Sequence, residues 1–332
     1  MAESANERTY DLIVVGGGMV GSALACATAE AGFEVCVLEV REPQSDWPAD
    51  EVDLRVSALS RSSQRILENL GVWQRMTEMR VSPYSDMHVW DAGGSGSIHF
   101  SAADIGEPNL GHIVENRVTQ LALWERLGEL PGATRRCPVA LGSLETGEQP
   151  KVILSDGSCL RARLLVGADG RESRVRQLAG IASQGWEYDQ HAIVATIQPE
   201  RHHRFTAWQR FMPSGPLAFL PVDDGRCSIV WSTSPRRAAA LMELDDGAFC
   251  HALSEASEGV LGAIQAVGPR GVFPLRLGHA QSYIREGLAL VGDAAHAIHP
   301  LAGQGVNLGL LDAASLAEVL IEARKVGRRL GS

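Results

Sequence analysis

The sequence predicts an α/β protein in which a domain with parallel strands is interrupted by a second, β-rich domain. Three observations predict this: a strand–helix–strand pattern near the N-terminus, a change to alternating strands in the middle, and a return to a buried strand and a long helix near the C-terminus. At about 150 residues per domain, 332 residues are enough for two domains. The first domain takes residues 1–82, 106–183 and 274–332, and the β-rich domain takes residues 83–105 and 184–273.

The N-terminal strand–helix–strand unit has the features of a dinucleotide-binding site. Residues 11–15 and 34–38 are continuous apolar runs, as in strands buried on both faces of a parallel sheet. Between them, a G-x-G-x-x-G turn opens a helix. In such sites the glycines allow a tight turn, close approach of a pyrophosphate and helix packing, while an acid after the second strand accepts from a ribose hydroxyl. These residues are Gly16, Gly18, Gly21 and Glu39. The alternative is a β–α turn without a ligand.

The middle of the chain supplies the β-rich domain. In the first domain, residues 57–70 and 116–130 have helical spacing. In the β-rich domain, alternation around the glycines at 93–96 predicts a hairpin. Alternating strands follow at 191–197, 205–211, 217–222 and 227–232, with one helix at 245–255. Aromatic and proline residues of this block are expected to line an apolar channel: Trp208, Phe211, Phe219 and Trp231, with Pro213 and Pro216.

A second motif, Gly167-Ala168-Asp169-Gly170, ends a predicted strand. Open α/β sheets bind ligands at the carboxyl ends of their strands, so Asp169 is a candidate ligand-binding residue. The alternative is that Asp169 caps a helix in an ordinary turn.

A third motif follows the predicted strand at residues 288–291. It begins with Gly292-Asp293-Ala294-Ala295-His296 and continues with Pro300-x-x-Gly303-x-Gly305-x-Asn307-x-Gly309-x-x-Asp312. Packing alone does not require an acid at a strand end followed by small residues in fixed positions. Free backbone amides at a helix N-terminus can hold an anion or a developing negative charge. A metal site at the histidine pairs 296/299 or 202/203 is the alternative, but neither pair has cysteines or carboxylates at ligand spacing.

The composition excludes several classes of protein. Apolar residues make up 45% and charged residues 21% of the chain, unlike a disordered or collagen-like protein. The net charge is −10, and because nucleic-acid proteins usually carry a basic surface, we expect no nucleic-acid partner. No stretch approaches the roughly 18 apolar residues of a membrane span. The six cysteines form no C-x-x-C pair, so we expect a cytoplasmic protein with reduced thiols, and contact with the inner membrane surface stays open.

The three motifs, in this order and spacing, resemble those of the FAD-dependent aromatic hydroxylases of the p-hydroxybenzoate hydroxylase type. More narrowly, the chain is similar to the flavin hydroxylases of ubiquinone biosynthesis, and most similar to the 2-polyprenylphenol hydroxylases among them. The resemblance includes Asp53-x-Arg55-Val56-Ser57-Ala58-Leu59, Gly71-Val72-Trp73, Val89-Trp90-Asp91, Leu110-Gly111-His112-Ile113-Val114-Glu115-Asn116 and Ser228-Ile229-Val230-Trp231-Ser232. It implies a Rossmann-like FAD-binding domain interrupted by a β-sheet substrate domain. Relatives continue with further helices, so C-terminal helices are expected to be truncated here.

The resemblance also implies cofactor-binding roles. Gly16, Gly18 and Gly21 would bind the FAD pyrophosphate, with Asp169 nearby in a motif associated with both FAD and NAD(P)H. Glu39 would bind the adenosine ribose.

On the flavin side, Arg55 and Asn116 would contact the cofactor, although many relatives have arginine in place of Asn116. Asp293 would bind the ribityl chain, and Asn307 belongs to the same cofactor-binding segment. No acid or base residue is assigned. The residues implied to line the isoalloxazine and to stabilise its negative charge are Pro300, Gly303 and Gly305.

The implied reaction is hydroxylation of a phenol ring. NAD(P)H reduces FAD, O2 adds at the flavin C4a, and the hydroperoxide transfers one oxygen to the ring, while the protein orients the reactants and excludes water. The implied partners are a polyprenylphenol, O2, bound FAD, transient NAD(P)H, and either pathway proteins or a second copy of the chain. Since only one G-x-G-x-x-G occurs, we expect no separate NAD(P)H domain. The alternatives are another ring position or a small aromatic substrate, a flavin dehydrogenase or oxidase, and a non-catalytic nucleotide-binding module.

Overall fold

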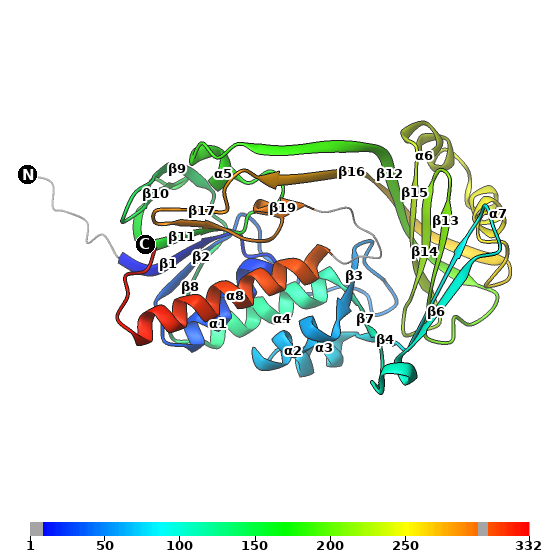
Figure 1. The fold of residues 1–332 in the computed structure, drawn as a ribbon, viewed down its shortest axis with the longest axis horizontal. Coiled ribbons are helices and arrows are strands. Elements are labelled where there is room, and N and C mark those ends of the chain that lie inside the picture. Colours follow the sequence, from blue (N-terminus) through cyan, green and yellow to red (C-terminus); the bar gives the residue numbers. More distant parts are fainter. Residues whose placement is uncertain (1–8, 298–304, 332) are drawn as a thin grey trace, which may run out of the picture.

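Two bodies joined by a long two-stranded ribbon make up the fold (Figure 1). The structure is a computed structural model and describes residues 9–297 and 305–331. The ribbon consists of β12 (Ser183–Pro199) and β16 (Ile264–Ala280), which pair antiparallel over most of their length. One body contains a parallel sheet with helices, and the other contains a mostly antiparallel sheet.

The parallel sheet has the strand order β17-β18-β11-β1-β2-β8. Its strands are β1 (Thr9–Val15), β2 (Val35–Leu38), β8 (Ala133–Arg136), β11 (Cys159–Gly167), β17 (Ile284–Arg285) and β18 (Leu288–Leu290), with β9 (Leu141–Glu145) and β10 (Lys151–Leu154) attached beside β11. Strand β1 is central because both of its faces are apolar: Leu12 and Val14 pack in one buried cluster, Ile13 and Val15 in another.

Helices cover both faces of this sheet. Helices α1 (Met19–Glu30), α4 (Asn116–Glu129) and α8 (Gly305–Lys325) lie together on one face, and the short α5 (Arg174–Leu178) lies on the other (Figure 1). Small residues along α1, including Ala23 and Ala25, are fully buried and allow the three helices to pack closely. None of the helices in the described ranges is long and apolar enough to cross a membrane.

The second sheet has the order β19-β16-β12-β15-β14-β13-β5-β6. Besides the ribbon, its strands are β5 (Asp86–Asp91), β6 (Ser97–Ser101), β13 (Thr206–Met212), β14 (Gly215–Pro221), β15 (Cys227–Thr233) and β19 (His296–Ala297). Helices α6 (Pro235–Met242) and α7 (Asp246–Ala256) cover one of its faces.

A three-stranded sheet lies against the other face of the second sheet. It contains β3 (Val56–Ser60), β7 (Gly111–Glu115) and β4 (Ser82–Tyr84), accompanied by α2 (Arg61–Asn69), α3 (Trp73–Met79) and the 3-10 helix η1 (Ala102–Ile105). A second 3-10 helix, η2 (Gly292–Ala294), follows β18 and contacts α8. Ala58 and Ile113 of this small sheet pack against Ala207 and Leu220 of the second sheet. We call this face of the second sheet the inner face.

The helix predicted for residues 57–70 begins later than expected. Residues Val56–Ser60 form β3, which pairs with β7. Helix α2 starts at Arg61, and the Ser60 hydroxyl accepts a hydrogen bond from the Ser63 amide as its cap. Strand pairing with a distant segment therefore overrides the helical spacing in this stretch.

The prediction of an apolar channel lined by aromatic residues is wrong for three of the four. Trp208, Phe219 and Trp231 belong to the core between the second sheet and helices α6 and α7. Since side chains alternate along a strand, Phe211 lies on the opposite face from its neighbours Arg210 and Met212. The aromatics stabilise the sheet–helix core, because two helices cover the face on which they lie.

Candidate functional site

The three motifs of the sequence meet at one edge of the parallel sheet. Strands β18, β11 and β1 are parallel neighbours, and each is followed by one motif at its carboxyl end. The turn from Gly16 to Gly21 follows β1, Asp169 follows β11, and Asp293 follows β18. The structure thus brings together residues separated by more than 250 positions, at the edge where open α/β sheets bind ligands.

The three glycines of the first turn differ in their surroundings. A Cβ on Gly16, whose φ is +108°, would lie 2.4 Å from the Ala168 carbonyl oxygen, and a Cβ on Gly21 would lie 2.0 Å from the Gly16 carbonyl oxygen. A Cβ on Gly18 would meet nothing within 4 Å. Gly18 is also the N-cap of α1, and no side chain caps that helix. Open space beside uncapped amides fits the pyrophosphate of a dinucleotide.

Glu39 ties the end of β2 to the glycine turn. Its Oε2 accepts from the Gly17 amide at 2.6 Å, and its Oε1 accepts from the amides of Val40 and Arg41 at 2.8 and 3.0 Å. The carboxylate therefore lies beside the turn, as expected for a residue that also accepts from a ribose hydroxyl.

The carboxylate of Asp169 caps helix α5. It accepts from the Ser173 hydroxyl at 2.5 Å and from the amides of Arg174 and Val175 at 2.7 and 3.0 Å. Its backbone borders the glycine turn, since a Cβ on Gly16 would lie 2.9 Å from the Asp169 Cα. The side chain thus performs the capping role that was the alternative for this motif, next to the place expected for the pyrophosphate.

Asp293 lines a cleft of about 390 Å³ between α5 and the end of the ribbon that lies at the parallel sheet. The cleft also contains the guanidinium-bearing residues Arg171, Arg176 and Arg276. Arg176 donates to the Ala294 carbonyl at 2.8 Å and so ties α5 to the third motif. Arginines around a carboxylate at a strand end suit a ligand that carries both phosphates and hydroxyls.

Asn116 and Asn307 both fix strand β3. The Asn116 Oδ1 accepts from the Ser57 hydroxyl at 2.6 Å. The Asn307 Nδ2 donates to the Ala58 carbonyl at 2.8 Å, and its Oδ1 accepts from the Ser60 amide at 2.9 Å. These contacts place the first turn of α8, which begins at Gly305, beside β3. Of the other residues predicted for the flavin, Arg55 directly precedes β3, and Pro300 and Gly303 lie outside the described residues.

A histidine–aspartate pair closes the third motif. The His296 Nε2 lies 2.7 Å from the Asp312 Oδ2, which also accepts from the Gly292 amide at 2.9 Å. This hydrogen bond raises the pKa of His296 above its ordinary value of 6.5. The histidines of the other candidate metal pair serve local contacts: the His203 ring donates to the Val222 carbonyl, and His202 accepts from the Arg204 amide.

The variant Asp312→Asn is expected to lose stability mainly at low pH. Because folding raises the pKa of His296, the ion pair contributes fully below about pH 6.5, and its contribution disappears as the pH rises through the raised pKa. Denaturant unfolding of both proteins between about pH 5.5 and pH 9 measures this difference. Glu322→Gln, which removes the exposed pair with Lys325 on the same helix, is the control. Parallel curves for wild type and Asp312→Asn would contradict the assignment.

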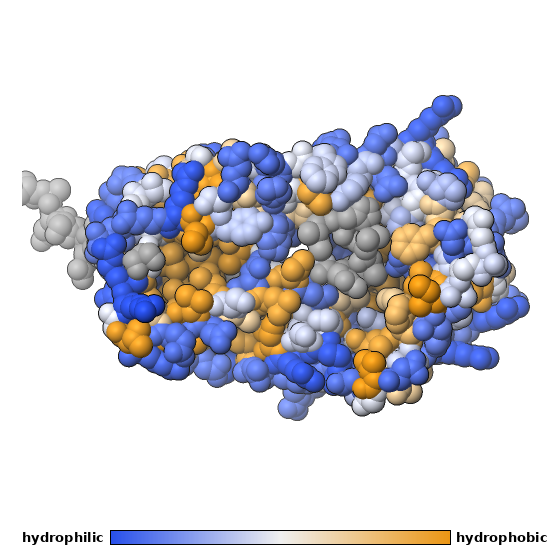
Figure 2. Space-filling model, in the orientation of Figure 1, coloured by the Kyte–Doolittle hydropathy of each residue, from blue (hydrophilic) through white to orange (hydrophobic). Residues whose placement is uncertain are grey.

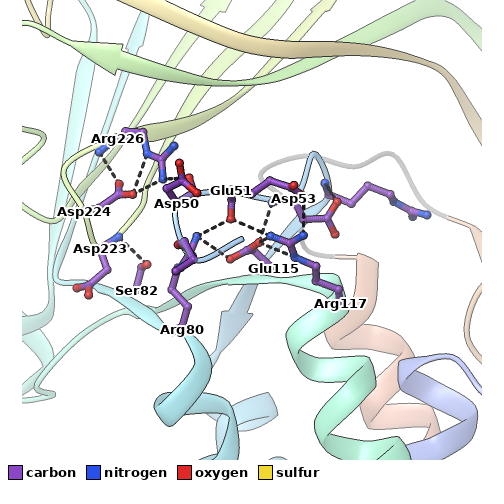
Figure 3. Close-up of polar contacts among 12 residues, drawn as sticks. Asp50, Glu51, Asp53, Arg80, Ser82, Glu115, Arg117, Asp223, Asp224 and Arg226 are labelled. Atoms are coloured by element: carbon purple, nitrogen blue, oxygen red, sulfur yellow. Dashed lines mark hydrogen bonds and ion pairs between the residues drawn. The ribbon is translucent and has the colours of Figure 1, made fainter. Parts of the chain in front are cut away.

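A buried charged cluster around Glu115 was not predicted from the sequence (Figure 3). Glu115, at the end of β7, is 3% exposed and lies between Arg80 and Arg117, its Oε1 3.1 Å from one and its Oε2 2.7 Å from the other. The available signal was an acid directly after the apolar pair Ile113-Val114, followed two residues later by an arginine.

Comparisons with known proteins identify the family of the chain. The family model described as FAD binding domain matches residues 9–329. The chain is 41% identical over 323 residues to the 3-demethoxyubiquinol 3-hydroxylase of Escherichia coli, covering 97% of this chain and 82% of that protein. It is 35% identical over 388 residues to the human mitochondrial ubiquinone biosynthesis monooxygenase COQ6, covering 99% and 80%.

Solved structures share the fold. A probable FAD-dependent monooxygenase of Pseudomonas aeruginosa, PqsL, superimposes with a TM-score of 0.81 at 23% identity, covering 97% of this chain and 89% of that chain. The p-nitrophenol 4-monooxygenase PnpA of Pseudomonas putida gives a TM-score of 0.76 at 21% identity, covering 97% and 82%. The family model, the relatives above and the motifs at the sheet edge show that the chain belongs to the FAD-dependent hydroxylases of ubiquinone biosynthesis.

Proposed function

We propose that this monooxygenase hydroxylates the ring of a polyprenylated phenol, with FAD bound and with NAD(P)H and O2 as co-substrates. The observation that carries ring hydroxylation in this pathway is the 41% identity, over nearly the whole chain, to a 3-demethoxyubiquinol 3-hydroxylase; the choice of a phenol as substrate rests on the resemblance of the motifs to the polyprenylphenol hydroxylases. The apolar inner face beside the flavin motifs supports it. NAD(P)H is proposed to visit transiently, since the sequence has a single G-x-G-x-x-G.

The described residues fit FAD, which when bound supplies the redox and oxygen-activating chemistry. The uncapped amides of α1 beside Gly18 bind the pyrophosphate. Glu39 accepts from the adenosine ribose, and Asp293 accepts from the ribityl hydroxyls. The backbone amide of Gly305, the first residue of α8, would hold negative charge on the ring system. Pro300 and Gly303, which lie outside the described residues, are proposed for the same ring system on the family resemblance alone.

The substrate ring is proposed to lie between the flavin and the inner face of the second sheet. Val194 lies opposite Gly271 in the ribbon, and Phe273 follows two residues later on the same face. A Cβ on Gly271 would lie 3.3–3.5 Å from Phe273, Leu54 and Val194. Phe273 is 40% exposed, which leaves apolar surface for an apolar ligand.

The second candidate is hydroxylation at another ring position of the same pathway. The names of the relatives favour it, since one acts on 3-demethoxyubiquinol and another is described as a ubiquinone hydroxylase. Product analysis with both a prenylated phenol and a demethoxyubiquinol separates the two candidates.

We also propose that the protein collects its apolar substrate at a membrane surface. Figure 2 shows hydrophobic residues at the end of the molecule that holds the second sheet. The exposed apolar side chains there include Ile98 and Phe100 on the edge strand β6 and Ile105 in η1. Phe100→Ser is expected to lower turnover of substrate embedded in vesicles, but not turnover of a short-tailed substrate in solution.

Tail length tests the proposed substrate. Each buried methylene contributes about 0.8 kcal/mol, so two of them correspond to roughly 15-fold in affinity. We expect kcat/KM for coupled hydroxylation to rise at least about tenfold as the tail lengthens. NAD(P)H oxidation, hydroxylated product and hydrogen peroxide are measured together for phenols of increasing prenyl length. If p-hydroxybenzoate supports coupled turnover better than prenylated phenols, the proposed substrate is wrong.

A further inference from the structure

The segment from Trp47 to Arg55, which we call the strap, is the last part of the connection between β2 and β3. It forms neither helix nor strand. Its final residue makes one backbone contact to α4, since the Arg55 carbonyl accepts from the Asn116 amide at 2.9 Å. Three arginines that are distant in the sequence, Arg80, Arg117 and Arg226, bind the rest of the strap (Figure 3).

Two of these arginines, Arg117 and Arg80, belong to the body that contains the parallel sheet. Arg117 donates from Nη1 to the Glu51 carboxylate and from Nη2 to the Glu51 carbonyl, each at 2.8 Å. Its guanidinium also lies 4.5 Å from the centre of the Trp47 ring. Arg80 donates to the Glu51 carbonyl at 3.1 Å and to the Ala49 carbonyl. The strap is therefore held by backbone and side chain together.

Glu115 joins both arginines to the strap. Its Oε2 accepts from the Arg117 Nε at 2.9 Å and from the Asp53 amide at 2.7 Å, and its Oε1 lies 3.1 Å from the Arg80 Nη1. Side-chain exposure is 3% for Glu115, 8% for Arg117 and 17% for Arg80. Without this carboxylate, two largely buried cations would face each other, and the partly buried Asp53 amide would lose its acceptor.

The strap is also tied to the second sheet. Arg226, in the turn between β14 and β15, donates from Nη2 to the Asp50 carbonyl at 2.7 Å, and Asp224 pairs with the same guanidinium. At the other end of the strap, the Leu54 side chain lies beside Gly271 on the inner face. One short segment thus contacts both bodies, and its position depends on contacts to each.

We propose that Glu115 is a positioning residue for the hydroxylation, which fixes the strap so that Arg55 reaches the flavin and Leu54 reaches the substrate. This inference rests on the proposed function, which places FAD beside the first residue and the substrate ring beside the second. The Asp53 amide is bound to Glu115, and the next two residues are Leu54 and Arg55. A displacement of the strap therefore moves both contacts together.

Glu115→Gln tests the inference, because glutamine keeps the shape of the side chain and removes its charge. Without substrate, we expect hydrogen exchange at the strap amides to become faster, and the dissociation constant of FAD to rise roughly tenfold. The absorbance and fluorescence of the bound flavin are expected to shift toward those of free flavin. Glu129→Gln is the matched control: on the same helix as Arg117, it removes a surface carboxylate that also pairs with two arginines, Arg75 and Arg126.

Two further variants separate the ends of the strap. Arg117→Lys keeps the charge but cannot contact the Glu51 side chain and carbonyl as a fork, so its strap exchange and FAD affinity are expected to lie between wild type and Glu115→Gln. Arg226→Ala releases only the tie to the second sheet. We expect its FAD affinity to stay within about twofold of wild type, while more hydrogen peroxide forms per hydroxylated product.

Wild-type strap exchange together with wild-type FAD affinity in folded Glu115→Gln would overturn the inference. If that variant does not fold, wild-type strap exchange in both Arg117→Lys and Arg226→Ala overturns it equally. The two proposals fail separately. A wild-type protein that binds FAD but hydroxylates no phenol refutes the substrate assignment, whereas strap exchange and flavin affinity still report on Glu115.

Discussion

Gly18→Val is expected to yield a folded protein that has lost FAD. Gly18 has an extended backbone that any residue adopts, and a Cβ there meets no other atom within 4 Å. The branched side chain therefore costs the fold little, but it fills the space beside the first amides of α1. Each hydrogen bond to a charged phosphate is worth about 1.5–3 kcal/mol, so losing two of them lowers affinity more than about 100-fold. Flavin content after purification and titration of the stripped protein with FAD measure the effect.

Gly21→Val is the contrasting variant for this glycine turn. Its Cβ would lie 2.0 Å from the Gly16 carbonyl oxygen and 3.0 Å from the Ala168 Cβ. Because helix α1 cannot pack against the turn with this side chain, we expect lower stability whether or not FAD is present. If Gly18→Val purifies folded with a full complement of flavin, the turn does not bind the pyrophosphate.

Asp293→Ala is expected to weaken FAD binding by roughly 10- to 150-fold, the range for loss of one hydrogen bond to a charged group. Asp293 is exposed, and within the described part of the chain its carboxylate has no hydrogen-bond partner. Its removal should therefore leave the stability of the stripped protein nearly unchanged. Titration with FAD, followed by the quenching of flavin fluorescence, gives the dissociation constant.

Asp169→Ala provides the comparison for Asp293. Its carboxylate accepts three hydrogen bonds at the start of α5, so its loss is expected to cost about 0.5–2 kcal/mol of stability, the usual cost of losing a helix cap. The ratio of the two effects thus distinguishes a ligand-binding acid from a capping acid. Equal losses of FAD affinity and of stability in Asp293→Ala would contradict its assignment to the ribityl chain.

Local patterns in the sequence were sufficient for much of the fold. The strand and helix expected at residues 11–31 are β1 and α1, and the four strands expected between 191 and 232 are β12 to β15. These elements follow from apolar periodicity, which the sequence displays directly. The length of the ribbon did not follow, because β12 and β16 pair across the 64 residues (200–263) that lie between them. Strand β3 was missed for the same reason, since its partner β7 is distant.

In the candidate site too, local patterns were predictable and contacts between distant segments were not. The motif positions after β1, β11 and β18 could be assigned from glycine and acid spacing alone. Which face of a strand packs in the core could not be assigned in this way. Alternation puts Trp208 and Phe211 on opposite faces of one strand, but the sequence does not show which of these faces α6 and α7 cover. Glu115 was missed because its partners, Arg80 and Arg117, come together only when β7 and the strap are in place.

The ribbon connects the second sheet to the segment around Asp293, which is proposed to bind the flavin side of the cofactor. Strands β12 and β16 carry the inner face at one end, and at the other end β16 pairs with β19 through His279 and His296. The Ala280 amide donates to the Ala295 carbonyl at 2.7 Å, two residues after Asp293. A paired ribbon twists more easily than it stretches. A rotation of the second sheet about a bound substrate would therefore twist the ribbon and shift the segment that carries Asp293, because backbone hydrogen bonds join the two.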